Sequence, residues 1–304
     1  MKISTLIVLF FVLTGIFSQN AIAQYDYTED LYYDHPFTYE MGASIGLMNC
    51  FTDLGGKEGF GKKYFKDFDA ANSQFAGSIY FTANYNYAIG LRAEATFGRV
   101  MASDRSLENI KSTTFGRYER NLSFKSNITE VMLAVEIHPR YLFKKYSERK
   151  KLPRFSPYLM GGIGLFSFNP QAKLNGQWIE LKPLSTEGQG FAEYPDRKPY
   201  KLKQLNFPVG IGIKYKLTPL FNVSLEYVSR ILNTDYLDDV STTYIDQALF
   251  AHYLAGNQLT NALLLNDRQY ELDPAHVTMK GYERGNPKSN DAYFTLNLKM
   301  SFVF

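Results

Sequence analysis

The stretch "DAYFTLNLKMSFVF" (291–304) has the period of two of a β-strand. Counted backwards from Phe304, every second residue down to Phe294 is apolar, and polar residues such as Lys299 and Asn297 stand between them. Strict alternation predicts a strand whose two faces meet different surroundings. This stretch therefore raises the question of which protein class ends on an alternating strand with a terminal aromatic residue.

Seven further segments alternate in a similar way, of which the fifth is glycine-rich and less regular. They cover residues 38–48, 75–85, 88–100, 128–139, 156–168, 206–217 and 221–230. Their connections alternate between turns (86–87, 140–155, 218–220) and long loops (49–74, 101–127, 169–205, 231–290). Outer-membrane barrels combine alternating strands of about ten residues with this asymmetry of connections. The sequence thus predicts an all-β fold, an eight-stranded antiparallel transmembrane β-barrel with long extracellular loops and short periplasmic turns.

A soluble β-sandwich is the rival fold, and the face opposite the apolar stripe argues against it. That face carries charges of both signs on most strands, namely Glu40, Arg92, Glu94, Glu130, Glu136, Lys214, Glu226, Arg230 and Lys299. Eight strands leave room inside for side chains rather than for a channel. Because buried charges are costly unless paired, we interpret these residues as a neutralised structural network in the lumen, with an ion-conducting pathway as the alternative.

The N-terminal residues have the three parts of a secretory signal peptide. Lys2 precedes an apolar run (6–17), and Ala21-Ile22-Ala23 forms an A-x-A cleavage site. As a helix the run would span only ~18 Å, too short for a ~30 Å hydrocarbon core. We expect cleavage after Ala23, which gives a signal peptide over 1–23 and an outer-membrane barrel over 24–304.

The composition of the mature chain excludes several classes. Its formal charge is +2 (33 basic residues, minus Lys2, minus 30 acidic residues), which argues against a nucleic-acid partner. The single cysteine, Cys50, allows no intrachain disulfide. No segment predicts a membrane-spanning helix.

No pattern in the sequence predicts a metal, nucleotide or nucleophilic site. The four histidines are His35, His138, His252 and His276, and none stands at metal-ligand spacing from another. We therefore expect that this protein binds no cofactor and is not an enzyme. A lipid A-modifying outer-membrane enzyme is a third alternative, with His252 or His276 at the outer rim of the barrel.

The second turn, over 139–154, is strongly basic and carries one acid, Glu148. Its basic residues are Arg140, Lys144, Lys145, Arg149, Lys150, Lys151 and Arg154. Such a turn suits an acidic periplasmic partner or lipid headgroups, and a solvated charge run is the alternative. The acidic, tyrosine-rich segment 24–36 would lie in the periplasm too, where it folds back on this turn or binds a partner.

The largest predicted outer loop, 231–290, holds two features. Asp235, Asp238 and Asp239 are candidate calcium ligands, but their spacing fits no standard calcium loop, so we favour capping and hydrogen bonds within the loop. The stretch "YIDQALFAHYLAGNQ" (244–258) predicts a short amphipathic helix.

Three stretches carry a family resemblance: "PLSTEGQG" (183–190), "FPVGIGIKYKL" (207–217) and "EYVSRILNTDYLDDVS" (226–241). They resemble the eight-stranded outer-membrane barrels of Bacteroidota, in the family that includes PorG, the barrel component of the type IX secretion system. The motif residues in the loops are Thr186, Glu187, Gly188, Asp235, Tyr236, Asp238 and Asp239.

The resemblance covers most of the mature chain and implies a non-enzymatic barrel that anchors a periplasmic assembly of a type IX-like secretion system. Its expected partners are outer-membrane lipid and periplasmic secretion-ring proteins. The terminal Phe304 resembles the signal that the outer-membrane assembly machinery reads. The alternative function is a surface-exposed binding or adhesion barrel that uses loops 169–205 and 231–290.

Overall fold

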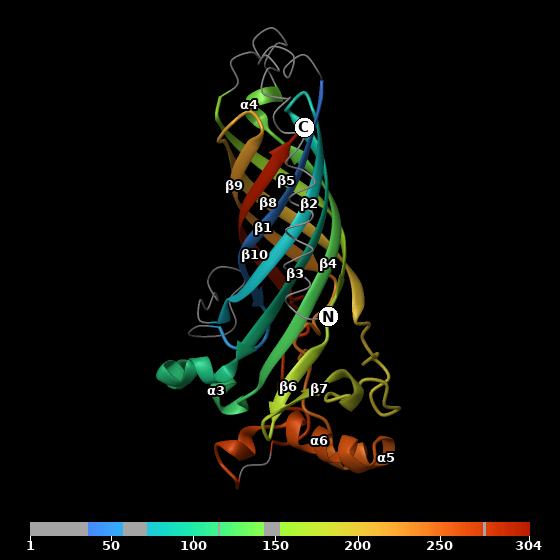
Figure 1. Cartoon of the computed structure of the whole chain (residues 1–304). Coiled ribbons are helices and arrows are strands. Elements are labelled where there is room, and N and C mark those ends of the chain that lie inside the picture. The colour runs from blue at the N-terminus through green and yellow to red at the C-terminus, as the bar shows by residue number, and fades with distance from the viewer. Residues whose placement is uncertain (1–35, 57–71, 115, 143–152, 276–277) are drawn as a thin grey trace, which may run out of the picture.

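The computed structural model describes residues 36–56, 72–114, 116–142, 153–275 and 278–304. Eight antiparallel strands close into a barrel, in which each strand pairs with its neighbour in the sequence (Figure 1). They are β1 (Phe37–Phe51), β2 (Gln74–Tyr85), β3 (Ile89–Ser103), β4 (Ser123–Ile137), β5 (Phe155–Ser167), β8 (Lys203–Lys216), β9 (Phe221–Leu232) and β10 (Ala292–Val303). Each predicted segment corresponds to one of these strands, so the predicted fold is confirmed.

The last strand closes the barrel against the first. β10 pairs with β1 over twelve positions, from Glu40 opposite Val303 to Phe51 opposite Ala292. The backbone N–H of Tyr39 donates to the carbonyl oxygen of Phe304 (3.0 Å), and the N–H of Phe304 donates to Tyr39 (2.9 Å). The C-terminal stretch therefore alternates because it is one wall of a closed sheet, with one face outside and the other inside.

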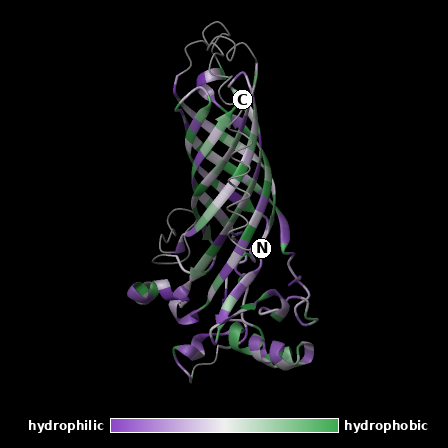
Figure 2. Cartoon of the chain, viewed as in Figure 1, coloured by the Kyte–Doolittle hydropathy of each residue, from purple (hydrophilic) through white to green (hydrophobic). Residues whose placement is uncertain are grey.

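Hydrophobic and hydrophilic residues alternate along the strands (Figure 2), and the exposed fractions place the apolar side chains on the outer face of the barrel. Side chains such as Ile45 (72% exposed), Ile79 (62%) and Met300 (57%) point away from the barrel. A barrel in water would bury such a surface, whereas a barrel in hydrocarbon exposes it to lipid tails. Exposed aromatic residues stand near both ends of this apolar belt, for example Phe75 at one end and Phe304 at the other. Membrane barrels carry aromatic girdles at the same two positions.

The two ends of the barrel differ in the length of their connections. At one, which we call the turn end, Asn86 (φ 53°) and Tyr87 (φ 57°) are the central residues of a tight turn between β2 and β3, in which the N–H of Ala88 donates to the carbonyl oxygen of Tyr85 (3.0 Å). The predicted tight turn at 86–87 is thus confirmed. The helix α4 (Pro139–Leu142) leaves β4 at the same end. Among the described parts of the chain, no helix is long and apolar enough to cross a membrane.

The opposite end, which we call the loop end, carries folded loops (Figure 1). The second loop contains η3 (Asp104–Thr113) and α3 (Arg117–Arg120), and the third contains β6 (Pro170–Leu174), β7 (Gln177–Glu180) and η5 (Lys182–Leu184). The fourth contains η6 (Gln247–Leu249), α5 (Phe250–Tyr253), α6 (Gly256–Asn266) and η7 (Gln269–Glu271).

These loops differ from the prediction at two places. The loop predicted over 169–205 holds the hairpin β6–β7, in which Asn175 and Gly176 make a tight turn with positive φ, and β6 pairs with β4. The single helix predicted over 244–258 is wrong, because the helical chain breaks at Leu254 and resumes at Gly256.

Two hydrophobic clusters hold the loop end together. The first fills the end of the lumen itself, with Met48, Phe124, Phe166 and Tyr293 all at most 1% exposed. The second lies further out, where Leu184 and Phe191 of the third loop pack with Phe250 and Leu265 of the fourth. The lumen is therefore closed by apolar side chains at this end, and two loops share a small core of their own.

Candidate functional site

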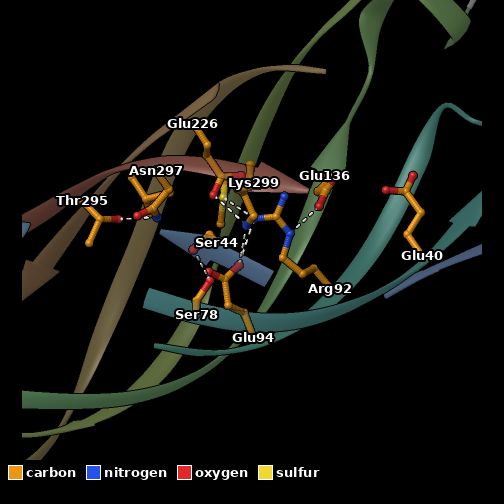
Figure 3. Close-up of polar contacts among 12 residues, drawn as sticks. Glu40, Ser44, Ser78, Arg92, Glu94, Glu136, Glu226, Thr295, Asn297 and Lys299 are labelled. Atoms are coloured by element: carbon orange, nitrogen blue, oxygen red, sulfur yellow. Dashed lines mark hydrogen bonds and ion pairs between the residues drawn. The ribbon is translucent and has the colours of Figure 1, made fainter. Parts of the chain in front are cut away.

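The middle of the lumen holds a cluster of ion pairs centred on Arg92 (Figure 3). Its Nη1 lies 2.6 Å from Glu226 Oε2 and 3.1 Å from Glu94 Oε2, and its Nε lies 2.5 Å from Glu136 Oε1. Lys299 Nζ bridges the same acids, at 2.8 Å from Glu94 and 2.9 Å from Glu226. Arg92 and Lys299 thus compensate most of the charge of three buried carboxylates in one layer.

The ion pairs continue toward both ends of the lumen. Toward the turn end, Lys214 Nζ lies 3.0 Å from Glu40 and 3.7 Å from Glu136. Toward the loop end, Arg230 lies 3.1 Å from Glu130. The structure therefore brings all nine predicted lumen charges into ion pairs, five acids against four bases, and only Lys214 among them is partly exposed.

Two tyrosines that the prediction did not single out complete the central layer. Tyr158 OH donates to Glu226 Oε2 at 2.6 Å, and the rings of Tyr80 and Tyr158 lie 5.3 Å and 5.8 Å from the Arg92 guanidinium carbon. Glycines make room for both rings, since a Cβ at Gly42 would stand 2.6 Å from Tyr80 and one at Gly212 would stand 2.3 Å from Tyr158. The glycines on the lumen face were the sequence signal for these large partners.

At the loop end, the family-motif residues of the third and fourth loops meet each other. Glu187 is fully buried and accepts hydrogen bonds from the N–H of Ser241 (3.0 Å) and Thr242 (2.9 Å), and it pairs with Arg284 (2.9 Å). Thr186 Oγ1 donates to Asp239 Oδ2 at 2.5 Å. A carboxylate with all these donors is a structural link between two loops rather than a free acid or base.

Gly188 permits the turn that presents Glu187. Its φ is +72°, and a Cβ there would stand 2.9 Å from the ring of Tyr194. Tyr236, from the fourth-loop motif, stacks on Tyr200 at 5.1 Å between centroids. The motif thus encodes the junction between the two loops.

The aspartates of the fourth-loop motif are buried among other acids. Asp239 accepts from Tyr200 OH (2.7 Å), and Asp238 accepts from the N–H of Val240 (2.9 Å). Burial, followed by the charge of Asp53, raises the pKa of Asp235 to about 9. Within the described ranges, no three His, Cys, Asp or Glu side chains are arranged to hold a metal ion. Asp238 and Asp239 thus accept hydrogen bonds from groups within the loops, which is the interpretation that the sequence favoured over calcium binding.

Two buried arginines that carry no sequence signal join the remaining loops. Arg120 pairs with Asp104 at 2.8 Å and donates to the carbonyl oxygens of Asp53 (2.7 Å) and Arg284. Arg284 donates in turn to the carbonyl oxygen of Asp239 (2.8 Å). Arg120 ends the short helix α3 and Arg284 lies in no regular element, and neither belongs to a motif, so only the folded chain reveals that they connect the first, second and fourth loops.

The other predicted site residues lie apart from these clusters. Arg140 donates to the carbonyl oxygen of Phe155 (2.8 Å) at the turn end, and Arg154 is exposed there. Phe304 is exposed beside Tyr39, with ring centroids 6.1 Å apart. His252 is exposed on α5. The remaining predictions fall outside the described residues: the signal peptide, nearly all of segment 24–36, His276, and Lys144, Lys145, Arg149, Lys150 and Lys151.

The chain matches no protein-family model and no curated protein. Solved structures that it resembles include a major outer membrane protein from Thermus thermophilus, at 14% identity and a TM-score of 0.40, covering 89% of this chain and 100% of that one. Ail, the attachment invasion locus protein of Yersinia pestis, has 10% identity and a TM-score of 0.36, covering 88% and 99%. Neisserial surface protein A has 9% identity and a TM-score of 0.36, covering 88% and 97%. Similarity this remote carries no information about what the present chain binds.

Proposed function

We propose that this chain is a non-enzymatic outer-membrane barrel that anchors a periplasmic assembly of a type IX-like protein secretion system. The observation that carries the proposal is the filled lumen. Arg92, Lys299 and their acidic partners occupy the middle of the barrel, and apolar side chains close the loop end. A barrel packed in this way is a rigid membrane body whose working surfaces are its two ends.

The outer membrane is the proposed location, because closed barrels with an apolar belt are the strand-built form that spans that membrane. In this orientation the turn end faces the periplasm and the loop end faces outward. The proposed contact for the secretion ring is the basic turn 139–154 together with segment 24–36. The exposed Arg154 lies at the turn end, where this contact would form.

The proposal is tested by a crosslinking pull-down from the native outer membrane, followed by charge reversal. A variant with Lys144, Lys145, Lys150 and Lys151 changed to Glu is expected to lose co-purifying periplasmic ring proteins. The same variant should keep the electrophoretic mobility of a folded barrel in an unboiled sample. The control reverses three lysines away from the turn end, Lys198, Lys201 and Lys203, which are exposed at the loop end. Unchanged co-purification in the first variant would refute the anchoring role.

A second candidate function is a surface-binding barrel, and the folded loop end favours it. The third and fourth loops share a buried core and the Glu187–Arg284 pair, which is more structure than a passive anchor needs. Removing residues 250–266, which form α5 and α6, would abolish binding to cells or surface ligands under this hypothesis and leave secretion intact. Normal cell binding after that deletion would count against it.

A further inference from the structure

The outward-facing positions of the barrel strands carry charge only toward the loop end. On the eight strands the charged residues on this face are Arg99, Lys125 and Lys203, and all three are positive. Toward the turn end the same face has no charged residue on any strand. In the proposed orientation these cations stand in the outer leaflet, so what they bind rests on the proposed location of the barrel and not on its anchoring role.

Arg99 and Lys125 form a cationic cluster with Lys173, an exposed residue of β6. β4 pairs with β3 on one side and with β6 on the other, which places Met101 and Gln171 opposite Lys125. Arg99 and Lys173 each stand two residues from one of these direct neighbours, so their Cα atoms lie about 7–8 Å from that of Lys125. The charges that act on the Lys125 ammonium are those of Arg99 and Lys173, both positive.

The contacts within the cluster hold its cations in place without neutralising them. The Nε of Arg99 donates to Asn127 Oδ1 at 2.9 Å, and the Lys125 ammonium lies 3.8 Å from the ring centroid of Trp178. Within the described part of the chain, no carboxylate forms an ion pair with any of the three cations. Like charges gathered without a counter-ion repel one another, so a ligand with several anionic oxygens would stabilise the cluster.

The cluster lies at the height where lipid headgroups begin. On β3 the exposed Phe97 of the apolar belt precedes Arg99 by two residues, and on β4 the exposed Val131 follows Lys125 by six. With a rise of ~3.3 Å per residue and a tilt of ~40°, Arg99 and Lys125 stand ~5–15 Å beyond these belt residues along the membrane normal. The headgroup layer occupies the ~5–7 Å that adjoin the hydrocarbon core, so it overlaps this range.

We propose that this cationic cluster binds a phosphate group of an outer-leaflet glycolipid of the lipid A type. A guanidinium fork beside two ammonium groups suits the oxygens of a phosphate, and the apolar belt directly below suits the acyl chains of the same molecule. An acidic protein would need cations that lie clear of the membrane. The position of the cluster next to the belt therefore favours a lipid over a protein partner.

Native mass spectrometry of the full-length protein in detergent tests the proposal, with lipid A, dephosphorylated lipid A and phosphatidylglycerol as probes. The unaltered protein is expected to retain lipid A and to bind the dephosphorylated form at least about tenfold more weakly. A triple variant, Arg99→Gln with Lys125→Gln and Lys173→Gln, should lose lipid A affinity by at least about tenfold, because charge-assisted hydrogen bonds to phosphate are lost.

Two further variants separate the cluster from general effects of charge or fold. The control changes three exposed loop lysines to Gln, Lys198, Lys280 and Lys288, and should bind lipid A normally. Lys125→Arg with Lys173→Arg preserves the charge of the cluster and should also bind normally. The triple variant should still co-purify ring proteins, because the cluster and the basic turn lie at opposite ends of the barrel, so this inference and the anchoring role can fail separately.

Four results would overturn the inference, and the two that compare probes on the unaltered protein need no variant to fold. Dephosphorylated lipid A binds as tightly as lipid A, or phosphatidylglycerol binds more tightly than lipid A. The triple variant, with the unboiled mobility of a folded barrel, retains as much lipid A as the unaltered protein does. Inorganic phosphate at the concentration of the lipid displaces it fully, which would indicate a site for a free anion. Absence of any lipid A binding would likewise reject the lipid and leave the cluster to an acidic protein.

Discussion

Asp235 shows how one side chain makes the loop end sensitive to pH. The residue is 8% exposed, and neither carboxylate oxygen has a hydrogen-bond partner among the described residues. Burial and the nearby charge of Asp53 raise its pKa to about 9, and burial likewise raises the pKa of Asp53 and of Asp239 to about 6. At neutral pH the folded loops therefore keep a proton on Asp235 that an unfolded chain would release.

The sign of the resulting pH dependence follows from these raised pKa values. The stabilisation from the Asp235 proton is complete below about pH 4, falls as pH rises, and is gone above about pH 9. Asp235→Asn should thus stabilise the loop end at pH 8 by about 1–3 kcal/mol, because the amide carries no charge to bury. Pulse proteolysis of the fourth loop at pH 6 and pH 8 should show a smaller pH difference in the variant.

The exposed Asp196 supplies the control, since Asp196→Asn should leave the proteolysis unchanged at both pH values. A pH difference that is as large in Asp235→Asn as in the unaltered chain would contradict the assignment. Asp53 and Asp239 should preserve part of the effect, because the pKa of each is raised in the same direction.

At the scale of a strand, the lumen glycines of β8 are a packing requirement. A Cβ at Gly212 would overlap the Tyr158 ring, whose hydroxyl binds Glu226. Gly212→Ala should destabilise the barrel by about 1–3 kcal/mol, measured by urea unfolding in lipid. Gly161→Ala in β5 is the matched control, because its added Cβ meets no atom within 4 Å. Equal stability of the two variants would show that the Tyr158 ring moves aside freely.

The strands were predictable from the sequence over the membrane belt, and less so near the loop end. β4 begins at Ser123 rather than 128, and β3 ends at Ser103 rather than 100. In this region the apolar side chains face inward: Phe124 and Ile128 lie on the same face as Glu130 and are 1% exposed. The polar–apolar pattern inverts because a hydrophobic cluster replaces the charged lumen, so the outward stripe no longer marks the strand.

The part of the candidate site that lies on the barrel strands was predictable from the sequence, whereas the part in the loops was not. All nine lumen charges follow from alternation, because the period of two assigns each side chain to a face. The hairpin β6–β7 had a signal in Asn175-Gly176, the dipeptide typical of tight hairpin turns, which the prediction did not use. Arg120 and Arg284 could not be predicted, since their contacts join loops that are distant in the sequence.

At the scale of the whole molecule, the packed lumen predicts a barrel that does not conduct. Ion pairs and tyrosine rings occupy its middle, and an apolar cluster closes one end. Purified protein in a planar lipid bilayer should show no resolvable conductance steps. Replacing Arg92, Tyr158 and Glu226 together with Ala removes the central layer and should introduce a leak, provided that the variant keeps the mobility of a folded barrel. Conductance of the unaltered protein would refute the sealed lumen.

The hairpin β6–β7 also carries an intrinsic fluorescent probe. The chain has one tryptophan, Trp178, which stands on β7 beyond the belt, with the ammonium of Lys125 only 3.8 Å from its ring centroid. Tryptophan emission therefore reports on the third loop alone, whereas circular dichroism reports mainly on the barrel wall. Spectra of the unmodified protein can thus follow the loops and the wall separately during refolding, without an attached dye.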